Sequence, residues 1–485
     1  MINKRLLLGA TLALGIVACE SPQDGITGAN AVAPRFQVSG TQGSVGINVV
    51  LTSAPTASIL ADLGTIGTVL DVVPEINALT MRVAASDLST VRRRPYVQAA
   101  APDAKRQGSP VDLVAATNFT NGISTWDQDA INVTAQPFSA QRVIPETGEG
   151  VYVGVLDTGL LDSWRQYLPQ ERIAEQYGIA FGGGGGEQGA VSSQPEKWEH
   201  DQNSHGTHVT STIIGYSFNG VSINGVAPMA TIIPVKVLNQ NGSGWSSVIA
   251  RGIVYIADLK AGPLSGSPVV INMSLGGPED PMEDAAIDYA ISRGVIVVAA
   301  AGNEGEAGMD FPGAYEPVIS AAASGWVGEW KPDATGATNT WWYASDVPDP
   351  TNASDYYIAD FSSRAKQGQD LDVAAPGSWV VGPYQTQSGQ TSYFFLGGTS
   401  MASPHVAGIV ALMAQKQPSL TAPEAEDILE RTAVPLPAGS RTIANPDGTT
   451  STVTWGADAT GAGLATATAA LDALSQTVAT GKHKR

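Results

Sequence analysis

The chain has 485 residues, of which 43% are hydrophobic and 15% are charged, and it contains a single cysteine. It can therefore bury a large core, and its length favours two or three units over one. The formal net charge of −19 argues against a nucleic-acid partner, because proteins that bind this polyanion present a basic face. With one cysteine there is no internal disulfide, and a metal site would need oxygen or imidazole ligands.

Residues 1–19 have the pattern of an export signal. Lys4 and Arg5 precede an apolar run, Leu6–Ala18, which is shorter than the roughly 20 residues of a membrane span. The ending "IVAC" resembles a bacterial lipobox, in which Cys19 becomes lipidated; an ordinary cleaved signal is the alternative. We expect an exported protein, either extracellular or periplasmic, or anchored outside a membrane through Cys19. Residues 20–44 are small, polar and Gly-rich, and predict a flexible tether.

Residues 45–106 predict a small α+β domain. The strand-like stretches "INVVLT" and "ALTMRVAA" alternate there with the helix-like stretches "ASILADLGTIG" and "ASDLSTVRRRP". Residues 107–122 have the composition of a linker.

From residue 123 to residue 478, apolar strand runs alternate with helical patterns. We expect strands at 151–156, 231–238, 268–273 and 295–300, and helices at 205–215, 246–259, 282–293 and 400–415. This alternation predicts an α/β fold with a doubly wound, mostly parallel sheet and helices on both faces. Insertions at 181–201 and 325–357 interrupt it, and residues 479–485 form a basic tail. The five glycines after Phe181 lack the Lys-Ser/Thr of a phosphate loop, which favours a surface loop.

Two candidate residues for chemistry lie in the first half of this region. Asp157 ends a predicted strand in "VLDTG", where it could form a turn or accept an imidazole N–H. His205 opens "HGTHV", which has three interpretations. It could be a histidine at a helix start, a general base, or a metal ligand together with His200 and His208.

Two further candidates lie later in the chain. Asn303 follows a predicted strand in "AAGNEG", where it could serve the backbone turn or donate its amide to an oxyanion. Ser400 in "GTSMA" could be a simple helix N-cap. With Asp157 and His205, however, the set supplies every group that a serine nucleophile needs: a base, a carboxylate that orients the base, and an oxyanion donor.

Six blocks follow one another in the order found in one known family: "VLDTG", "NSHGTHV", "GVAP", "INMSLGG", "AAGNEG" and "GTSMASPHVAG". From about Trp126 to Leu474 the chain resembles the subtilisin-like serine peptidases. The resemblance implies that Ser400 is the nucleophile, His205 the general base and Asp157 the orienting carboxylate. Asn303 and the main-chain N–H of Ser400 would form the oxyanion hole.

The resemblance also implies a site for extended peptides. The residues expected to bind the substrate are Gly242, Ser274, Leu275, Gly276, Ala300, Gly302 and Asp310. A carboxylate at Asp310, near the floor of the primary pocket, would favour Lys or Arg in the substrate. No organic cofactor is implied. Structural calcium is expected on oxygens of Ser217, Asn219, Val221 and Ile223, although Gln166 stands where the family has a ligating Asp.

Residues 45–106 resemble the inhibitory propeptide of the same family, which places self-cleavage close to Arg106. We therefore expect an exported, monomeric serine endopeptidase that is made as a zymogen, with proteins or peptides as substrates and its own propeptide as inhibitor. One alternative is a catalytically silent relative that serves as a scaffold. Another is a lipase or esterase, which would need a Gly-x-Ser-x-Gly elbow that "GTSMA" lacks.

Overall fold

The computed structural model describes residues 43–116, 126–134, 142–182, 188–189, 191–218, 220–332, 347–387, 389–390 and 392–481. These residues belong to one compact unit that spans Ser39–Arg485. The predicted export signal with Cys19, the tether as far as residue 42 and the tail from residue 482 lie outside the described residues. None of the helices in the described ranges combines the length and the hydropathy of a membrane span.

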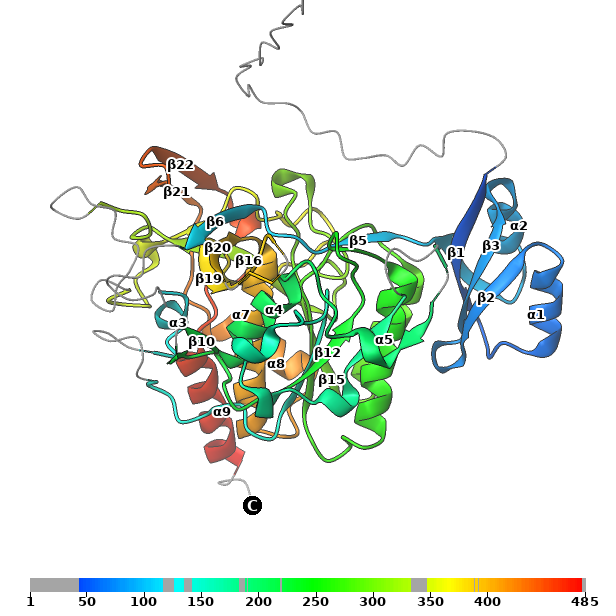
Figure 1. The fold of residues 1–485 in the computed structure, drawn as a ribbon, viewed down its shortest axis with the longest axis horizontal. Coiled ribbons are helices and arrows are strands. Elements are labelled where there is room, and N and C mark those ends of the chain that lie inside the picture. The colour runs from blue at the N-terminus through cyan, green and yellow to red at the C-terminus, as the bar shows by residue number, and fades with distance from the viewer. Residues whose placement is uncertain are drawn as a thin grey trace, which may run out of the picture. The chain divides into compact units, whose positions relative to one another are not determined.

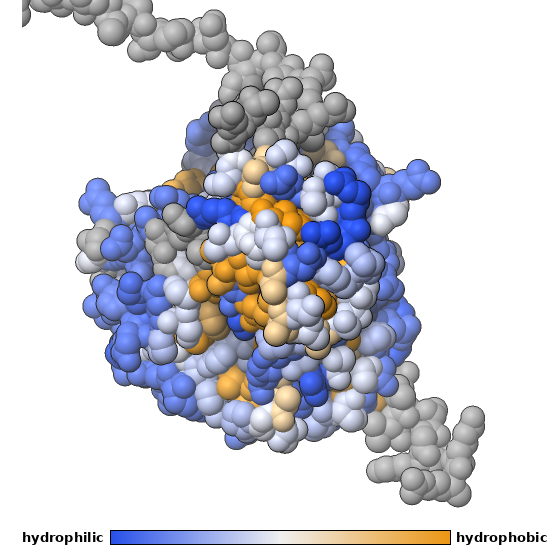
Figure 2. All heavy atoms as spheres, turned by 90° about the vertical axis from the view of Figure 1, so that its right-hand side faces the viewer, coloured by the Kyte–Doolittle hydropathy of each residue, from blue (hydrophilic) through white to orange (hydrophobic). Residues whose placement is uncertain are grey.

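The N-terminal domain is a four-stranded antiparallel sheet with two helices (Figure 1, blue). Its elements are β1 (Ser44–Leu51), α1 (Ala57–Gly64), β2 (Thr68–Val73), β3 (Ala78–Ala84), α2 (Leu88–Arg92) and β4 (Val97–Pro102), with the strands in the order β2-β3-β1-β4. Ile47 and Met81 are paired across β1 and β3 and are fully buried in its apolar core. The α+β architecture agrees with the prediction, and β2 is a strand that the sequence pattern did not indicate. Figure 2 views the molecule from this side, where hydrophobic side chains gather near the centre of the face.

The larger domain is built on a nine-stranded sheet in the order β17-β16-β15-β14-β7-β12-β8-β9, with β18 paired to β16. Its strands are β7 (Tyr152–Asp157), β8 (Ile179–Phe181), β9 (Ser193–Gln194), β12 (Thr231–Lys236), β14 (Val269–Met273), β15 (Val295–Ala300), β16 (Ile319–Trp326), β17 (Tyr356–Ile358) and β18 (Val373–Pro376). The central strands are parallel, whereas β9 and β17 run antiparallel at the two edges. The four predicted strands correspond to β7, β12, β14 and β15.

Helices cover both faces of this sheet. They are α3 (Trp126–Ala130), α4 (His205–Ile214), α5 (Ser246–Ala261), α6 (Pro281–Ser292), α7 (Thr399–Lys416), α8 (Ala422–Thr432) and α9 (Ala467–Gly481). On β7, Val153 and Val155 join the core formed with α4 and α7, while Leu156 joins the core formed with α5 and α6. This alternation follows from the period of two along a strand. It confirms the predicted doubly wound α/β fold.

Smaller sheets complete the domain. β5 (Lys105–Gln107) pairs with β13 (Ser243–Trp245), β10 (Tyr216–Phe218) pairs with β11 (Val221–Ile223), and β21 (Gly439–Ala444) pairs with β22 (Thr450–Trp455). A three-stranded sheet contains β19 (Val380–Pro383), β20 (Tyr393–Gly397) and β6 (Asp112–Ala116).

The predicted linker at 107–122 is therefore only partly correct. Residues 112–116 form a strand, because β20 offers them a partner that is distant in the sequence. Figure 1 shows the chain leaving the N-terminal domain through β5 and continuing into β6. Residues 117–122 lie outside the described ranges.

Candidate active site

The three predicted catalytic side chains lie where strands and helices of the larger domain begin or end. Asp157 is the last residue of β7, His205 is the first residue of α4, and Ser400 is the second residue of α7. All three are buried, with exposed fractions of 0%, 0% and 2%. The carboxyl end of a parallel strand and the amino ends of two helices thus supply the site.

The imidazole of His205 is held by the carboxylate of Asp157. Nδ1 of His205 lies 2.8 Å from Oδ1 and 3.0 Å from Oδ2 of Asp157, and the main-chain N–H of Thr158 also donates to Oδ1 at 2.6 Å. This arrangement favours the tautomer with its proton on Nδ1. Nε2 of His205 is buried and has no hydrogen-bond partner among the described residues. It is therefore available to accept a proton.

The hydroxyl of Ser400 donates to the carbonyl of Ser274 at 3.2 Å and is not hydrogen-bonded to His205. Both groups nevertheless face the same stretch of chain. A Cβ placed on Gly108 would lie 3.5 Å from Cε1 of His205 and 2.8 Å from the carbonyl oxygen of Ser274. The base and the acceptor of the Ser400 hydroxyl therefore both border Gly108.

Asn303 is fixed by the residue that precedes Ser400. Oδ1 of Asn303 accepts the main-chain N–H and the hydroxyl of Thr399, each at 2.9 Å. The carbonyl of the Asn303 side chain is thus occupied, and its NH₂ group remains to serve as a donor. Ser400 follows Thr399 in the first turn of α7, where main-chain N–H groups lack intrahelical partners. These donors suit an oxyanion.

Residues 105–108 lie in a cleft of the larger domain between β13 and the segment that follows β14. Gln107 exchanges two main-chain hydrogen bonds with Gly276, both of 2.9 Å, and Gly108 donates to the carbonyl of Gly242 at 2.8 Å. On the other side, β5 is antiparallel to β13. Gly242, Ser274 and Gly276 therefore contact the chain's own segment as they would contact an extended peptide. The side chain of Leu275 is 1% exposed and packs in the core with α5 and α6.

Arg106 does not lie beside the candidate catalytic residues. It pairs with Gly244 in β13, and its side chain is fully buried against Glu283. The residue next to His205 is Gly108, and Cα of Pro110 would lie 3.8 Å from a Cβ on Gly398. In this register Gly108 and the residues after it, rather than Arg106 itself, lie nearest to the candidate catalytic residues. The sequence alone could not reveal this register, because distant strands fix it.

Asp310 lies between two glycines of the candidate primary pocket. A Cβ on Gly276 would lie 2.7 Å from Oδ2 of Asp310, and a Cβ on Gly302 would lie 3.0 Å from the same atom and 2.9 Å from Oε2 of Glu304. Burial, and next the charge of Glu304, raise the pKa of Asp310 to about 8. Ala300, at the end of β15, is 3% exposed. The sequence prediction did not include Glu304, although it follows Asn303 directly.

Three of the four residues expected to bind calcium, Ser217, Val221 and Ile223, lie in the β10–β11 hairpin. Val221 and Ile223 are paired with Phe218 and Tyr216 in the β10–β11 hairpin. The carbonyl of Ser217 accepts the hydroxyl of Tyr393 at 3.0 Å, and Asn219 lies outside the described residues. No group of three or more His, Cys, Asp or Glu side chains within the described ranges could hold a metal ion.

The three-histidine alternative is likewise not supported. His200 is exposed and lies 3.5 Å from Asp162, whereas His208 is buried and bonds to the carbonyl of Val380 at 3.2 Å. Burial lowers the pKa of His208 to about 3. The two side chains have separate partners and do not converge on His205.

The loop before His205 contains a buried carboxylate that the sequence prediction missed. Asp201 accepts the hydroxyl of Thr158 at 2.9 Å and the main-chain N–H groups of Asn203 and Ser204 at 2.8 and 2.9 Å. The hydroxyl of Thr158 in turn accepts the N–H of Gly206 at 2.9 Å. Burial raises the pKa of Asp201 to about 6. These contacts tie the start of α4 to the end of β7.

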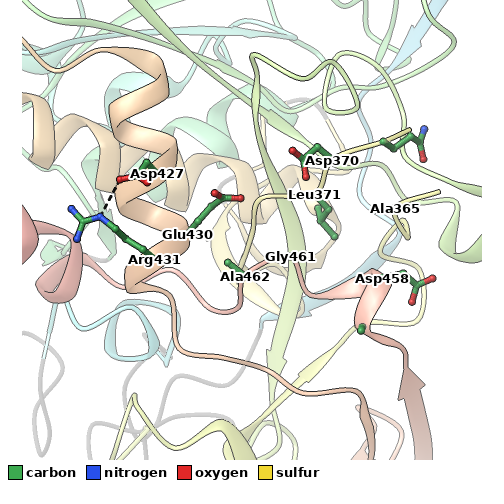
Figure 3. Close-up of a pocket in the computed structure, with 11 residues that line it drawn as sticks. Ala365, Asp370, Leu371, Asp427, Glu430, Arg431, Asp458, Gly461 and Ala462 are labelled. Atoms are coloured by element: carbon green, nitrogen blue, oxygen red, sulfur yellow. Dashed lines mark hydrogen bonds and ion pairs between the residues drawn. The ribbon is translucent and has the colours of Figure 1, made fainter. Parts of the chain in front are cut away.

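A cavity of about 550 Å³ lies elsewhere in the larger domain (Figure 3). Asp370, Asp458 and Glu430 line it, and Asp427 of α8 pairs with Arg431 at 3.1 Å. None of the candidate catalytic residues lines this cavity.

Comparison with known proteins places this geometry in one family. The pattern described as "Subtilase family" matches residues 148–464, which contain Asp157, His205, Asn303 and Ser400. The chain belongs to the subtilase family.

Two relatives illustrate the extent of the match. This subtilase is 36% identical over 295 residues to subtilisin E of Bacillus subtilis, covering 60% of this chain and 62% of subtilisin E. It is 32% identical over 381 residues to an extracellular serine proteinase of a Thermus species, covering 78% of this chain and 77% of that relative. The chain spans 63% of another relative, a thermostable alkaline protease of Halalkalibacterium halodurans, with 33% identity over 290 residues and 60% of this chain covered.

Solved structures agree on the fold. Fervidolysin from Fervidobacterium pennivorans, described as a keratinolytic enzyme related to subtilisin, covers 89% of this subtilase with a TM-score of 0.61 and 22% identity. The match spans 61% of the fervidolysin chain. The S41 psychrophilic protease covers 72% of this chain, with a TM-score of 0.52, 27% identity and 99% of that structure aligned.

Proposed function

We propose that this subtilase is an exported serine endopeptidase that is made as a self-processing zymogen. One observation carries the proposal. The Asp157–His205 pair leaves a buried Nε2 without a partner, next to a segment of chain that is bound as an extended strand. A base that is oriented in this way and faces a bound main chain suits acyl transfer from a peptide bond.

In the proposed reaction, the Ser400 oxygen attacks the substrate carbonyl carbon while Nε2 of His205 takes the hydroxyl proton. Asp157 stabilises the resulting imidazolium. The side-chain amide of Asn303 and the main-chain N–H of Ser400 donate to the oxyanion. The imidazolium then protonates the leaving amine. Water hydrolyses the acyl-enzyme, which restores Ser400. For the initial attack the Ser400 hydroxyl must turn from the carbonyl of Ser274 toward Nε2 of His205.

The N-terminal domain acts in this proposal as an intramolecular inhibitor. Its contacts support that role, because residues 105–108 fill the cleft between Gly242 and Gly276. Asp103 adds a second contact, since its carboxylate accepts the main-chain N–H of Ser247 at 3.0 Å in the first turn of α5. We expect the self-cleaved bond to be one of the three between Gly108 and Val111.

Three further features belong to the proposal. Residues 1–19 direct export, and Cys19 is either lipidated or removed with a cleaved signal. Cleavage after Gly108 would release the enzyme from such an anchor. The mature enzyme is a monomer and needs no organic cofactor. A structural calcium ion on oxygens of Ser217, Val221 and Ile223 also stays part of the proposal, with Asn219 outside the described residues.

Basic primary specificity is also proposed. Two carboxyl groups near one another at Gly302, those of Asp310 and Glu304, favour a cationic substrate side chain.

A fluorophosphonate probe tests the enzyme class, because it labels an activated serine. We expect labelling and casein hydrolysis by the processed chain, and loss of both in Ser400→Ala. Ser440→Ala, at an exposed position whose main-chain carbonyl bonds Arg441, is the matched control and should keep both activities. Labelling without any proteolysis would favour an esterase. Absence of both in the unmutated chain would favour the silent scaffold.

A further inference from the structure

The side chain of Arg106 is fully buried against Pro278 and Glu283 of the larger domain while the N-terminal domain is in place, although Arg106 belongs to an otherwise exposed strand. Its side chain is 0% exposed, whereas its neighbours Lys105 and Gln107 are exposed. Nη1 of Arg106 donates to the carbonyl of Pro278 at 2.6 Å, and Nη2 lies 2.5 Å from Oε2 of Glu283. We name the space between Pro278 and Glu283 the Arg106 pocket.

The larger domain supplies the negative charge of this pocket. Glu283 lies in the first turn of α6 and is 1% exposed, and neither of its carboxylate oxygens has a hydrogen-bond partner in the described residues, so its contact with Arg106 is an ion pair only. Asp280, the N-cap of α6, adds a second buried carboxylate within electrostatic reach of Arg106. Burial raises the pKa of Glu283 to about 7, while the charge of Arg106 acts against this shift. A buried carboxylate of this kind is stabilised by a cationic occupant.

The wall of the pocket also fits the chain closely. A Cβ on Gly277 would lie 2.3 Å from the carbonyl oxygen of Lys105 and 3.1 Å from Nη1 of Arg106. A side chain at position 277 would therefore displace the arginine and its backbone. The pocket is thus shaped for a guanidinium that follows this strand.

We propose that the Arg106 pocket is a specificity subsite that selects arginine in protein substrates. In the bound strand, Gly108 lies beside His205, and the subsite takes the side chain two positions before it, where Arg106 stands. This inference rests on the proposed peptidase function. Once the propeptide has left, Gly244 and Gly276 would bind the main chain of a substrate in the same register, which directs the side chain at that position to Glu283.

Arginine suits the pocket better than lysine. The two contacts lie at separate nitrogens of one guanidinium, Nη1 for the Pro278 carbonyl and Nη2 for Glu283. Lysine offers a single ammonium group and cannot reproduce this fork. The competing explanation is that the Arg106–Glu283 pair only holds the propeptide in the zymogen.

The test uses the processed enzyme, obtained from the full chain, and two fluorogenic peptides with the sequence of residues 102–114. One peptide keeps arginine at position 106, and the other carries citrulline, which has nearly the same shape but no charge. We expect kcat/KM for cleavage after Gly108, Ser109 or Pro110, identified by mass spectrometry of the products, to be at least about tenfold higher for the arginine peptide, since the charge pair with Glu283 is lost with citrulline. Equal kcat/KM values would overturn the inference. The Arg106–Glu283 pair would then serve only to hold the propeptide in the zymogen.

The variant Glu283→Gln tests whether Glu283 causes the preference for the arginine peptide. The ratio between the two peptides should fall to near one, while cleavage of the citrulline peptide continues. Glu279→Gln removes the same charge from an exposed neighbour in the loop before α6 and should keep the ratio. An unchanged ratio in Glu283→Gln would overturn the inference. If that variant fails to mature, the two peptides with the unmutated enzyme still decide. Cleavage of neither peptide would instead contradict the proposed peptidase function.

Discussion

Thr399 holds the side chain of Asn303 with two hydrogen bonds of 2.9 Å, one from its main-chain N–H and one from its hydroxyl. The residue before the candidate nucleophile therefore orients the candidate oxyanion donor. Thr399 is fully buried, and its one hydroxyl hydrogen is shared between Oδ1 of Asn303 and the carbonyl of Gly302, which lies 3.1 Å from the hydroxyl oxygen. It is a positioning residue.

We predict that Thr399→Val lowers kcat by about tenfold and changes KM little. The substitution keeps the side-chain shape but removes one of the two bonds to Asn303, a loss of roughly 1 kcal/mol or more. Steady-state kinetics with a peptide substrate measure this. Thr399→Ser, which restores the hydroxyl, should recover most of the rate. An increase in KM with unchanged kcat would assign Thr399 to substrate binding instead.

Asp310 should give the enzyme a pH-dependent preference for basic residues. Its pKa is raised to about 8, so the carboxyl is protonated below that pH and charged above it. The ratio of kcat/KM for lysine over phenylalanine substrates should therefore rise between about pH 6 and pH 9. Asp310→Asn should give a low ratio that does not vary with pH. A ratio that falls as pH rises would contradict this assignment.

Processing should produce a new N-terminus at Ser109, Pro110 or Val111. These residues follow Gly108, which borders His205, whereas Arg106 is held by Glu283. N-terminal sequencing and intact mass of the secreted protein determine the position. Ser400→Ala should remain unprocessed. A new N-terminus at Gln107 would restore the original expectation and require a different register in the cleft.

Gly108→Ala should slow self-processing. A Cβ at this position would lie 2.7 Å from Cδ1 of Leu238 and 2.8 Å from the carbonyl oxygen of Ser274, so the segment must shift away from His205. The time course of conversion on a gel measures the effect.

The matched control for this experiment is Gly64→Ala, because an added Cβ there meets no atom within 4 Å. This variant should mature at the normal rate. Equal rates for the two variants would show that Gly108 is not bound in the cleft when the chain is cut.

The central fold was predictable because its signals are local. The strands at Val269–Met273 and Val295–Ala300 are continuous apolar runs, as expected for strands covered on both faces. The four residues Asp157, His205, Asn303 and Ser400 could be proposed because short motifs surround them. The observed hydrogen bonds between Asp157 and His205 agree with that proposal.

The features that were missed depend on partners far away in the sequence. β6 has an ordinary linker composition, with Leu113 exposed, and becomes a strand only because β20 pairs with it. Cleavage was expected close to Arg106 because residues 45–106 resemble the family's propeptide. The true neighbours of Arg106 are fixed by the pairing of Gln107 with Gly276 and by Glu283, which no local pattern connects to it.

The strand β6 has a consequence for what remains after the cut. Val111 donates its N–H to the carbonyl of Gly397 at 2.7 Å, and residues 112–116 stay paired with β20, which leads through Gly397 and Gly398 into Thr399 and Ser400. Only the upstream end of the severed chain is then free to depart. The downstream end stays paired with the segment that leads to the nucleophile. After maturation, the new N-terminus would therefore remain bound at the edge of the catalytic groove.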